Sequence, residues 1–150
     1  MKKLINILFA VLINCTANAQ WFKQKIDNHF DPPKIICYTG LYAGPQLHLA
    51  KNIYGEVVLF TKNIPTQGQD TLNIEFSYLI GDEYYKTEQI CYKNGNEIIL
   101  IPDLALSNML EDFIDCTSLS IRINKNNSNK TIYHFNMEGK IHALKFILKN

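Results

Sequence analysis

The stretch LNIEFSYLI, residues 72–80, carries the clearest secondary-structure signal in the chain. Apolar and polar side chains alternate along it, which is the pattern of a β-strand with one buried face and one solvated face. Phe76 lies at its centre and is expected to lie in the core. The apolar set is Leu72, Ile74, Phe76, Tyr78 and Ile80, and the polar set is Asn73, Glu75 and Ser77.

Two turn signals after this strand predict a β-meander. Gly81-Asp82 is a tight-turn pair, after which residues 83–92 run back along the first strand. Asn94-Gly95 is a strong hairpin signal, because both residue types tolerate positive φ. Residues 97–101 form the return strand, and a two-residue loop at Asn94-Gly95 places Cys91 opposite Ile98.

Weaker signals extend the pattern in both directions. Phe22, Ile26 and Phe30 recur every four residues, which favours a short helix before Asp31. Further strands are expected at residues 35–39, 46–50, 56–61, 118–123 and 131–137. One helix face is predicted from Leu106, Met109, Leu110, Phe113 and Ile114, and another after Gly139 from Ile141, Leu144, Phe146, Ile147 and Leu148.

These elements predict a mainly β fold with about seven or eight strands and two short helices. A β-sandwich or a partly closed antiparallel barrel buries such strands best. The sequence contains no internal repeat and no sign of a second domain, so residues 20–150 are expected to form a single β-rich domain of ordinary length.

Residues 1–19 have the three-part pattern of a secretory signal peptide. Met1-Lys2-Lys3 is basic, residues 4–13 are apolar except for Asn6, and Ala17-Asn18-Ala19 fits a signal peptidase site. The apolar part spans about 15 Å as a helix, about half of a bilayer core, so cleavage is expected rather than a retained anchor. The alternative is acylation of Cys15, because Leu12-Ile13-Asn14-Cys15 is a distorted lipobox, which would make the chain a membrane-anchored lipoprotein. Both routes predict a domain that works outside the cytoplasm, either periplasmic or secreted.

The charge balance points to no polyanionic partner. The full chain is +1 at pH 7, and loss of Lys2 and Lys3 leaves 13 basic and 14 acidic residues. Nucleic-acid binding needs a clustered basic face, and the sequence shows none, so no nucleic-acid partner is expected. No later apolar run approaches the roughly 18 residues of a transmembrane span.

Three cysteines follow the signal peptide: Cys37, Cys91 and Cys116. Export permits a disulfide, and the odd count allows at most one bond within the chain, with three pairings. If a bond forms, Cys37 with Cys91 is the expected pair, because both lie in strand interiors and Cys116 lies at a helix-to-strand junction. The alternative is that all three are small buried apolar groups.

No motif predicts catalysis, a metal site or a cofactor. The histidines are scattered, no cysteine pair has zinc spacing, and the acidic residues lack calcium-loop spacing. The sequence also lacks a phosphate-binding loop and a Gly-x-Ser-x-Gly elbow. We therefore expect a protein that is not an enzyme, with no catalytic residue, no metal ligand and no cofactor.

Tyrosines in or beside loops are the best candidates for a partner-binding surface. Tyrosine offers a large contact area at low entropic cost, as binding loops exploit. The alternative is that these residues simply suit β surfaces. The candidates are Tyr38, Tyr42, Tyr84 and Tyr85, with Tyr54 as a further loop tyrosine.

From Leu72 onward the chain combines an alternating strand, a hairpin, a short helix and a last strand that ends Phe135-Asn136-Met137-Glu138-Gly139, followed by Ala143-Leu144. This half of the chain resembles small exported proteins of the invasion-associated locus B type, which have a Phe-x-Leu-x-Gly…Ala-Leu ending. The resemblance implies an exported β-sandwich without established catalytic residues, so it carries over no site. The paired cysteines of that family are not matched, since no cysteine follows Cys116.

The leading hypothesis is a non-enzymatic binding module in the cell envelope or the secreted fraction, with another envelope or secreted protein as its partner. A second is a periplasmic enzyme inhibitor or immunity protein, which needs one protruding loop. A third is a hydrolase whose site is assembled across strands, which a deep pocket with two or more ionisable groups would support.

The protein isolated from the envelope fraction is expected to begin at Gln20. The reason is that Ala17 and Ala19 fit the peptidase, whereas Asn14 spoils the lipobox. Intact mass spectrometry measures the cleavage site. A mass that includes a diacylglycerol group on Cys15 would show that the chain is a lipoprotein instead.

Overall fold

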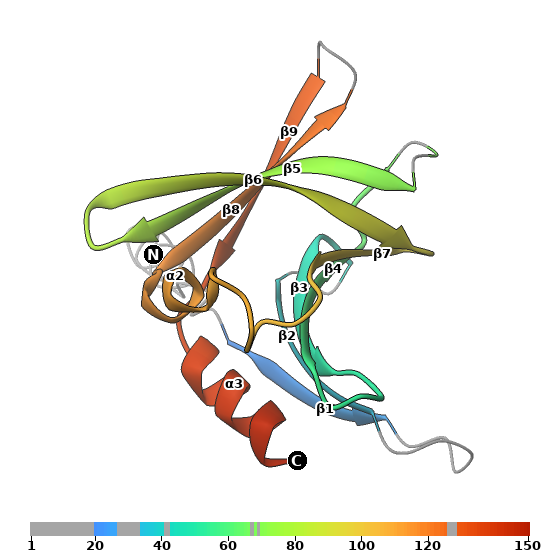
Figure 1. Ribbon diagram of the computed structural model, residues 1–150, viewed down its shortest axis with the longest axis vertical. Helices are drawn as coiled ribbons and strands as arrows, with labels where there is room; N and C mark the ends of the chain where they lie inside the picture. Colours follow the sequence, from blue (N-terminus) through green and yellow to red (C-terminus); the bar gives the residue numbers. More distant parts are fainter. Residues whose placement is uncertain (1–19, 27–33, 41–42, 67, 69, 126–128) are drawn as a thin grey trace, which may run out of the picture.

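The computed structural model describes residues 20–26, 34–40, 43–66, 68, 70–125 and 129–150. In these residues, nine strands form one antiparallel sheet in the order β1-β2-β3-β4-β7-β6-β5-β8-β9 (Figure 1). The strands are β1 (Phe22–Ile26), β2 (Lys34–Gly40), β3 (Gln46–Lys51), β4 (Val57–Lys62), β5 (Thr71–Ile80), β6 (Glu83–Asn94), β7 (Glu97–Ile101), β8 (Ser118–Lys125) and β9 (Asn129–Asn136). The helices of these residues are α2 (Leu110–Asp115) and α3 (Lys140–Lys149).

The sheet is open and strongly bent. Figure 1 shows β1–β4 grouped on one side of the molecule, with β5, β6 and β8 crossing above them. The register between β4 and β7 shifts at Leu59 and Phe60, and irregularities of this kind bend a strand. The expected mainly β, antiparallel fold with two helices is confirmed. All nine described strands belong to one sheet, whose edges β1 and β9 do not pair with each other.

The two helices cover one face of the sheet, which we call the inner face, and this face forms the core. α2 packs against β5, and α3 packs against β2 and β3. Leu72, Ile74, Phe76 and Tyr78 of β5 are buried there, as the alternation predicts, and Ile80 at the end of the strand is half-buried. The same cluster contains Phe113 of α2 and Ala143 and Ile147 of α3. The opposite, outer face carries neither of these helices.

Two tight hairpins set the register of the central strands. Gly81 has a φ of 60°, and Ile80 pairs with Glu83 across the Gly81-Asp82 turn, as expected. In the second hairpin Asn94 pairs with Glu97, so the loop is Gly95-Asn96 and the expected Asn94-Gly95 loop is wrong. The reason is that Gly95 takes the positive φ, 59°, at the first central position, which is the geometry of a type II′ turn. The register moves by two residues, which leaves every side chain on its expected face.

The expected helix through Phe22 and Ile26 is wrong, because these residues form β1. Phe22 pairs with Tyr38 and Ile26 with Lys34 on β2. A spacing of four residues is even, so it also places side chains on the same face of a strand. Phe30, the third residue of that pattern, lies outside the described residues.

The helix predicted from Leu106 to Ile114 is shorter than expected. α2 begins only at Leu110, and Leu106 is exposed. Before α2, the Asp103 side chain accepts a hydrogen bond from the N–H of Ala105, and the Ser107 hydroxyl accepts one from Met109. Such local bonds compete with helical ones and delay the helix start. α3 forms as expected, with Ile147 in the core.

Phe76→Ala is expected to unfold or nearly unfold the protein. The Phe76 ring is fully buried between β6 and β8 on the inner face and stacks near Tyr78, with ring centroids 6.3 Å apart. Loss of a buried phenylalanine ring costs about 3–5 kcal/mol of a domain stability of roughly 5–15 kcal/mol. Urea unfolding measures this loss. Asn73→Ala, on the exposed face of the same strand, is the matched control and should change stability by less than about 1 kcal/mol.

Candidate functional site

The outer face of β6 carries a row of exposed side chains, which we call the outer row. β6 pairs with β5 from Glu83 to Tyr92, whereas it pairs with β7 only at Tyr92–Asn94. The large apolar members are strongly exposed: Tyr84 66%, Ile90 66% and Tyr92 62%. Two oppositely charged residues lie between them. The outer row consists of Tyr84, Lys86, Glu88, Ile90 and Tyr92, all of them exposed.

The structure separates the tyrosines that the sequence singled out. Tyr84 belongs to the outer row, whereas its neighbour Tyr85 lies on the opposite face and donates a hydrogen bond to Glu83 at 2.9 Å. Tyr38 is half-buried on β2. Tyr54 is exposed in the turn between β3 and β4, and Tyr42 lies outside the described residues.

Sequence reasoning missed Ile90 and Tyr92 as members of a surface. The signal was present, because Tyr84, Ile90 and Tyr92 are separated by even numbers of residues and therefore share one face of a strand. What the sequence did not show was which face of β6 the helices leave open.

A shallow polar groove of about 250 Å³ borders the outer row at Tyr84 and Lys86. Glu75 of β5 and Arg122 of β8 form an ion pair across it, with Nη1 and Oε2 3.0 Å apart. Beside them the Ser120 hydroxyl lies 2.7 Å from Nδ1 of His134. The antiparallel register places Glu75 opposite Arg122 and Ser120 opposite His134, so all four side chains lie on the outer face.

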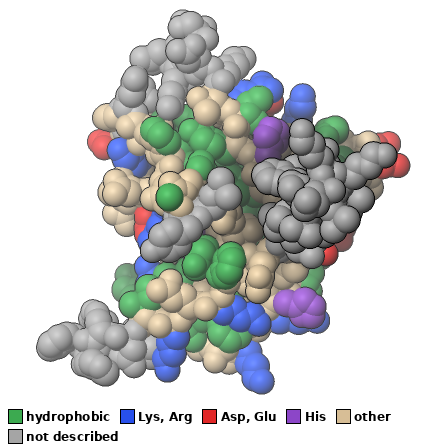
Figure 2. All heavy atoms as spheres, turned by 180° about the vertical axis from the view of Figure 1, so that it is seen from behind, with side chains coloured by type: hydrophobic (Ala, Val, Ile, Leu, Met, Phe, Trp, Pro, Cys, Tyr) green, Lys and Arg blue, Asp and Glu red, His purple; other side chains and the backbone are tan. Residues whose placement is uncertain are grey.

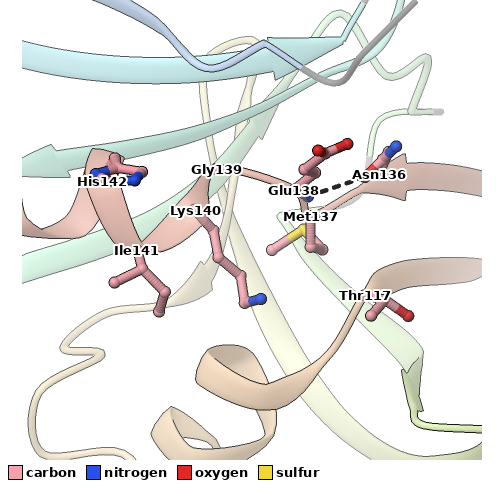
Figure 3. A pocket seen from close by; sticks show the side chains of 8 residues that line it. All are labelled: Thr117, Asn136, Met137, Glu138, Gly139, Lys140, Ile141 and His142. Atoms are coloured by element: carbon pink, nitrogen blue, oxygen red, sulfur yellow. Dashed lines mark hydrogen bonds between the residues drawn. The ribbon is translucent and has the colours of Figure 1, made fainter. Parts of the chain in front are cut away.

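Apart from this groove, a hollow of about 540 Å³ lies where α3 begins (Figure 3). It is formed by the end of β9, the first turn of α3 and Thr117, which precedes β8. Thr117 accepts a hydrogen bond from the N–H of Met137 at 3.1 Å, which holds the two segments together. Its other lining residues are Asn136, Glu138, Gly139, Lys140, Ile141 and His142.

The three cysteines are separate buried thiols, so the expected Cys37–Cys91 disulfide is not formed. Cys37 is on β2 and Cys91 on β6, with β3, β4 and β7 between them in the sheet order. Burial raises the pKa of Cys37, and it raises the pKa values of Cys91 and Cys116 to about 11. A thiol that stays protonated at neutral pH is a poor nucleophile, so these residues act as small apolar groups.

An aromatic ladder crosses the outer face of β1–β4. Phe22, Tyr38, His48 and Phe60 stack in that order, with ring centroids 5.3, 5.2 and 5.0 Å apart. His48 is buried, and its Nε2 lies 3.0 Å from Oε1 of Gln46. Burial, together with the charges of Lys62 and Lys34, lowers the pKa of His48 to about 3. The imidazole is therefore neutral at pH 7 and serves as a packed ring.

Within the described residues, no group of three or more His, Cys, Asp and Glu side chains is arranged to hold a metal ion. None of the helices in that part of the chain has the length and apolar character needed to cross a membrane. Comparison of the chain with protein-family models, with curated proteins and with solved structures finds no match.

The free energy of unfolding is expected to fall as the pH drops from about 6.5 toward 3, in part because of His48. Its pKa in the folded state is about 3, while in the unfolded chain it is near its ordinary 6.5, so in this range only the unfolded state takes up the proton. Each proton that only the unfolded state binds lowers the free energy of unfolding by about 1.4 kcal/mol per unit decrease in pH. Urea unfolding between about pH 6.5 and 5, where most carboxylates do not titrate, measures the slope.

His48→Phe should reduce the pH dependence of the free energy of unfolding by the amount that one proton contributes. Phenylalanine keeps a ring in the ladder but does not titrate. Phe22→Leu, which alters the ladder without removing an ionisable group, should leave the slope unchanged. Equal slopes for wild type and His48→Phe would mean that His48 titrates normally in the folded protein.

Proposed function

We propose that this chain is a non-enzymatic binding module of the cell envelope or the secreted fraction, which binds another protein through the outer row. The pattern of residues 1–19 supports export. The observation that carries the binding role is the exposure of Tyr84, Ile90 and Tyr92, each more than 60%, on one strand of the sheet. Ile90 and Tyr92 are neighbours on this face, and Lys86 and Glu88 separate them from Tyr84. Exposed apolar side chains rimmed by polar residues mark interaction sites.

The chemistry of the outer row favours a protein partner over a nucleic acid. Lys86 and Glu88 contribute one charge of each sign, and the neighbouring Arg122 is paired with Glu75. The surface therefore has no excess of positive charge with which to neutralise phosphates. Aromatic side chains rimmed by mixed charges are typical of protein–protein interfaces.

The inhibitor or immunity alternative has less support from the described residues. That role needs a protruding loop, whereas the two hairpins at the ends of β6 have tight two-residue turns. A flat strand face is better suited to a broad contact than to plugging an enzyme cleft.

The hydrolase alternative has one observation in its favour, the 2.7 Å contact between Ser120 and His134. A serine nucleophile works with a histidine base that a third group orients. In the described part of the chain His134 makes no second hydrogen bond, and the cross-strand register by itself accounts for the pair. Ser120 and His134 therefore fit a polar border of the binding surface better than a catalytic pair.

The double variant Tyr84→Ala/Tyr92→Ala is expected to fold normally and to lose its partner. Each ring is mostly exposed, so each truncation should cost less than about 1 kcal/mol of stability. Loss of two aromatic anchors should weaken partner capture at least about tenfold, since each interface anchor contributes about 2 kcal/mol or more. Affinity capture from the native envelope with the immobilised domain, alongside urea unfolding, measures both effects.

Tyr54→Ala is the matched control, because Tyr54 is an exposed tyrosine in the β3–β4 turn, away from the outer row. It should capture the same partner as the wild type. Equal capture by the double variant would refute the role of the outer row, and a double variant as unstable as Phe76→Ala would show that these rings belong to the core.

A further inference from the structure

We propose that the hollow at the start of α3 binds a small organic anion, whose carboxylate or phosphate group contacts Lys140 and the first-turn N–H groups of α3 and whose apolar part packs on Ile141. This site is separate from the outer row and does not depend on the proposed protein partner. Its lining comes from the end of β9, the start of α3 and Thr117.

Lys140 is the first observation that points to an anion. Only 8% of the residue is exposed, yet its Nζ atom is not among the buried polar atoms that lack a partner, so the stem is buried while the amino group reaches the surface. Among the described residues, no hydrogen bond or ion pair reaches its Nζ atom. Figure 3 shows the Lys140 side chain extending beside Met137 along the hollow, with its amino group free of any bond to the residues drawn.

The N-terminus of α3 is the second observation. The N–H of Lys140 donates to the carbonyl of Met137, and that of Ala143 donates to Gly139, both at 3.2 Å. The N–H groups of Ile141 and His142, between them, have no acceptor in the described residues, and no side chain caps the helix. Free N–H groups and the positive end of the helix dipole together favour an anion at this position.

The charges on α3 itself agree with this assignment, although Asp112 and Asp115 of α2 lie near Cys116 together with Lys140. α3 contains Lys140, Lys145 and Lys149 and no acidic residue. Glu138, the acidic residue in the lining, points away from Lys140 in Figure 3, and its backbone N–H is held by Asn136 at 2.9 Å. Figure 2 shows Lys and Arg side chains along the lower edge of the molecule, at the height of α3 and β1 in Figure 1. These charges would raise the local concentration of anions.

The size and lining of the hollow indicate an anion that carries an apolar body. Its volume of about 540 Å³ lies in the range of small-molecule sites, about 300–1,000 Å³, and exceeds what a single inorganic ion fills. Ile141, which is half-buried, supplies apolar surface to the hollow. A carboxylate and a phosphate monoester both present the oxygen acceptors that such a site requires.

Titration of the domain with hexanoate, hexyl phosphate and hexanol tests the proposal in the wild-type protein. NMR chemical shifts report binding, and the backbone N–H signals of Ile141 and His142 report its location. The charged probes should bind at least about tenfold more tightly than hexanol, which shares their chain but lacks the charge. The ratio between hexanoate and hexyl phosphate identifies the preferred head group. Equal affinity for hexanol, or binding that leaves these two N–H signals unmoved, would overturn the proposal.

Lys140→Met tests the role of the charge, because methionine keeps most of the apolar stem of lysine. This variant should lose at least about tenfold in affinity for the preferred charged probe, while Lys145→Met, an exposed lysine of the same helix, should bind as the wild type does. Unchanged affinity in Lys140→Met would overturn the proposal. Capture of a protein partner through the outer row should be unaffected in Lys140→Met, so the two proposals can fail independently.

Discussion

The burial of the inner face of β5 is the constraint on which the rest of the structure depends. β5 pairs with β6 on one side and β8 on the other, and its alternate residues Leu72, Ile74, Phe76 and Tyr78 are all buried. Their contacts join the sheet to Phe113 of α2 and, through the shared cluster, to α3. Because side chains alternate along a strand, burial of these residues also determines which residues of β6 and β8 face outward.

The outer row follows from that constraint. β6 is antiparallel to β5, so the residues of β6 beside Leu72 and Phe76 point inward and the intervening ones point outward. Both helices lie on the inner side, and the outer face of β6 therefore presents Tyr84, Ile90 and Tyr92 to solvent. The same register brings Glu75, Arg122, Ser120 and His134 together as the polar groove beside this row. The strand that carries this surface is hydrogen-bonded to β5 from Glu83 to Tyr92 and to β7 at Tyr92–Asn94.

The hollow at the start of α3, which Lys140 lines, arises in a different way from the outer row. The chain leaves β9 at Asn136 and turns at Gly139, whose φ of 81° is in the left-handed region that glycine adopts at little cost. That turn starts α3 without a capping side chain and leaves two N–H groups free at its first turn. Lys140 is the first residue of the helix and is buried at once, so a charge and a helix N-terminus lie in the same hollow. Packing of Ala143 and Ile147 into the core holds this end of α3 in place.

The sequence by itself determined the mainly β class, the β5 strand with Phe76 in the core, the Gly81-Asp82 turn and the final helix. These features depend on local periodicity and turn chemistry, which act over a few residues. The tertiary structure alone decided that Phe22 and Ile26 form an edge strand, because a spacing of four residues suits either a helix or a strand until a pairing partner is present. It also separated Tyr84 from Tyr85, kept Cys37 and Cys91 apart on distant strands, and buried Lys140. Each of these outcomes depends on which segments, far apart in sequence, become neighbours in the bent sheet, and no local pattern contains that information.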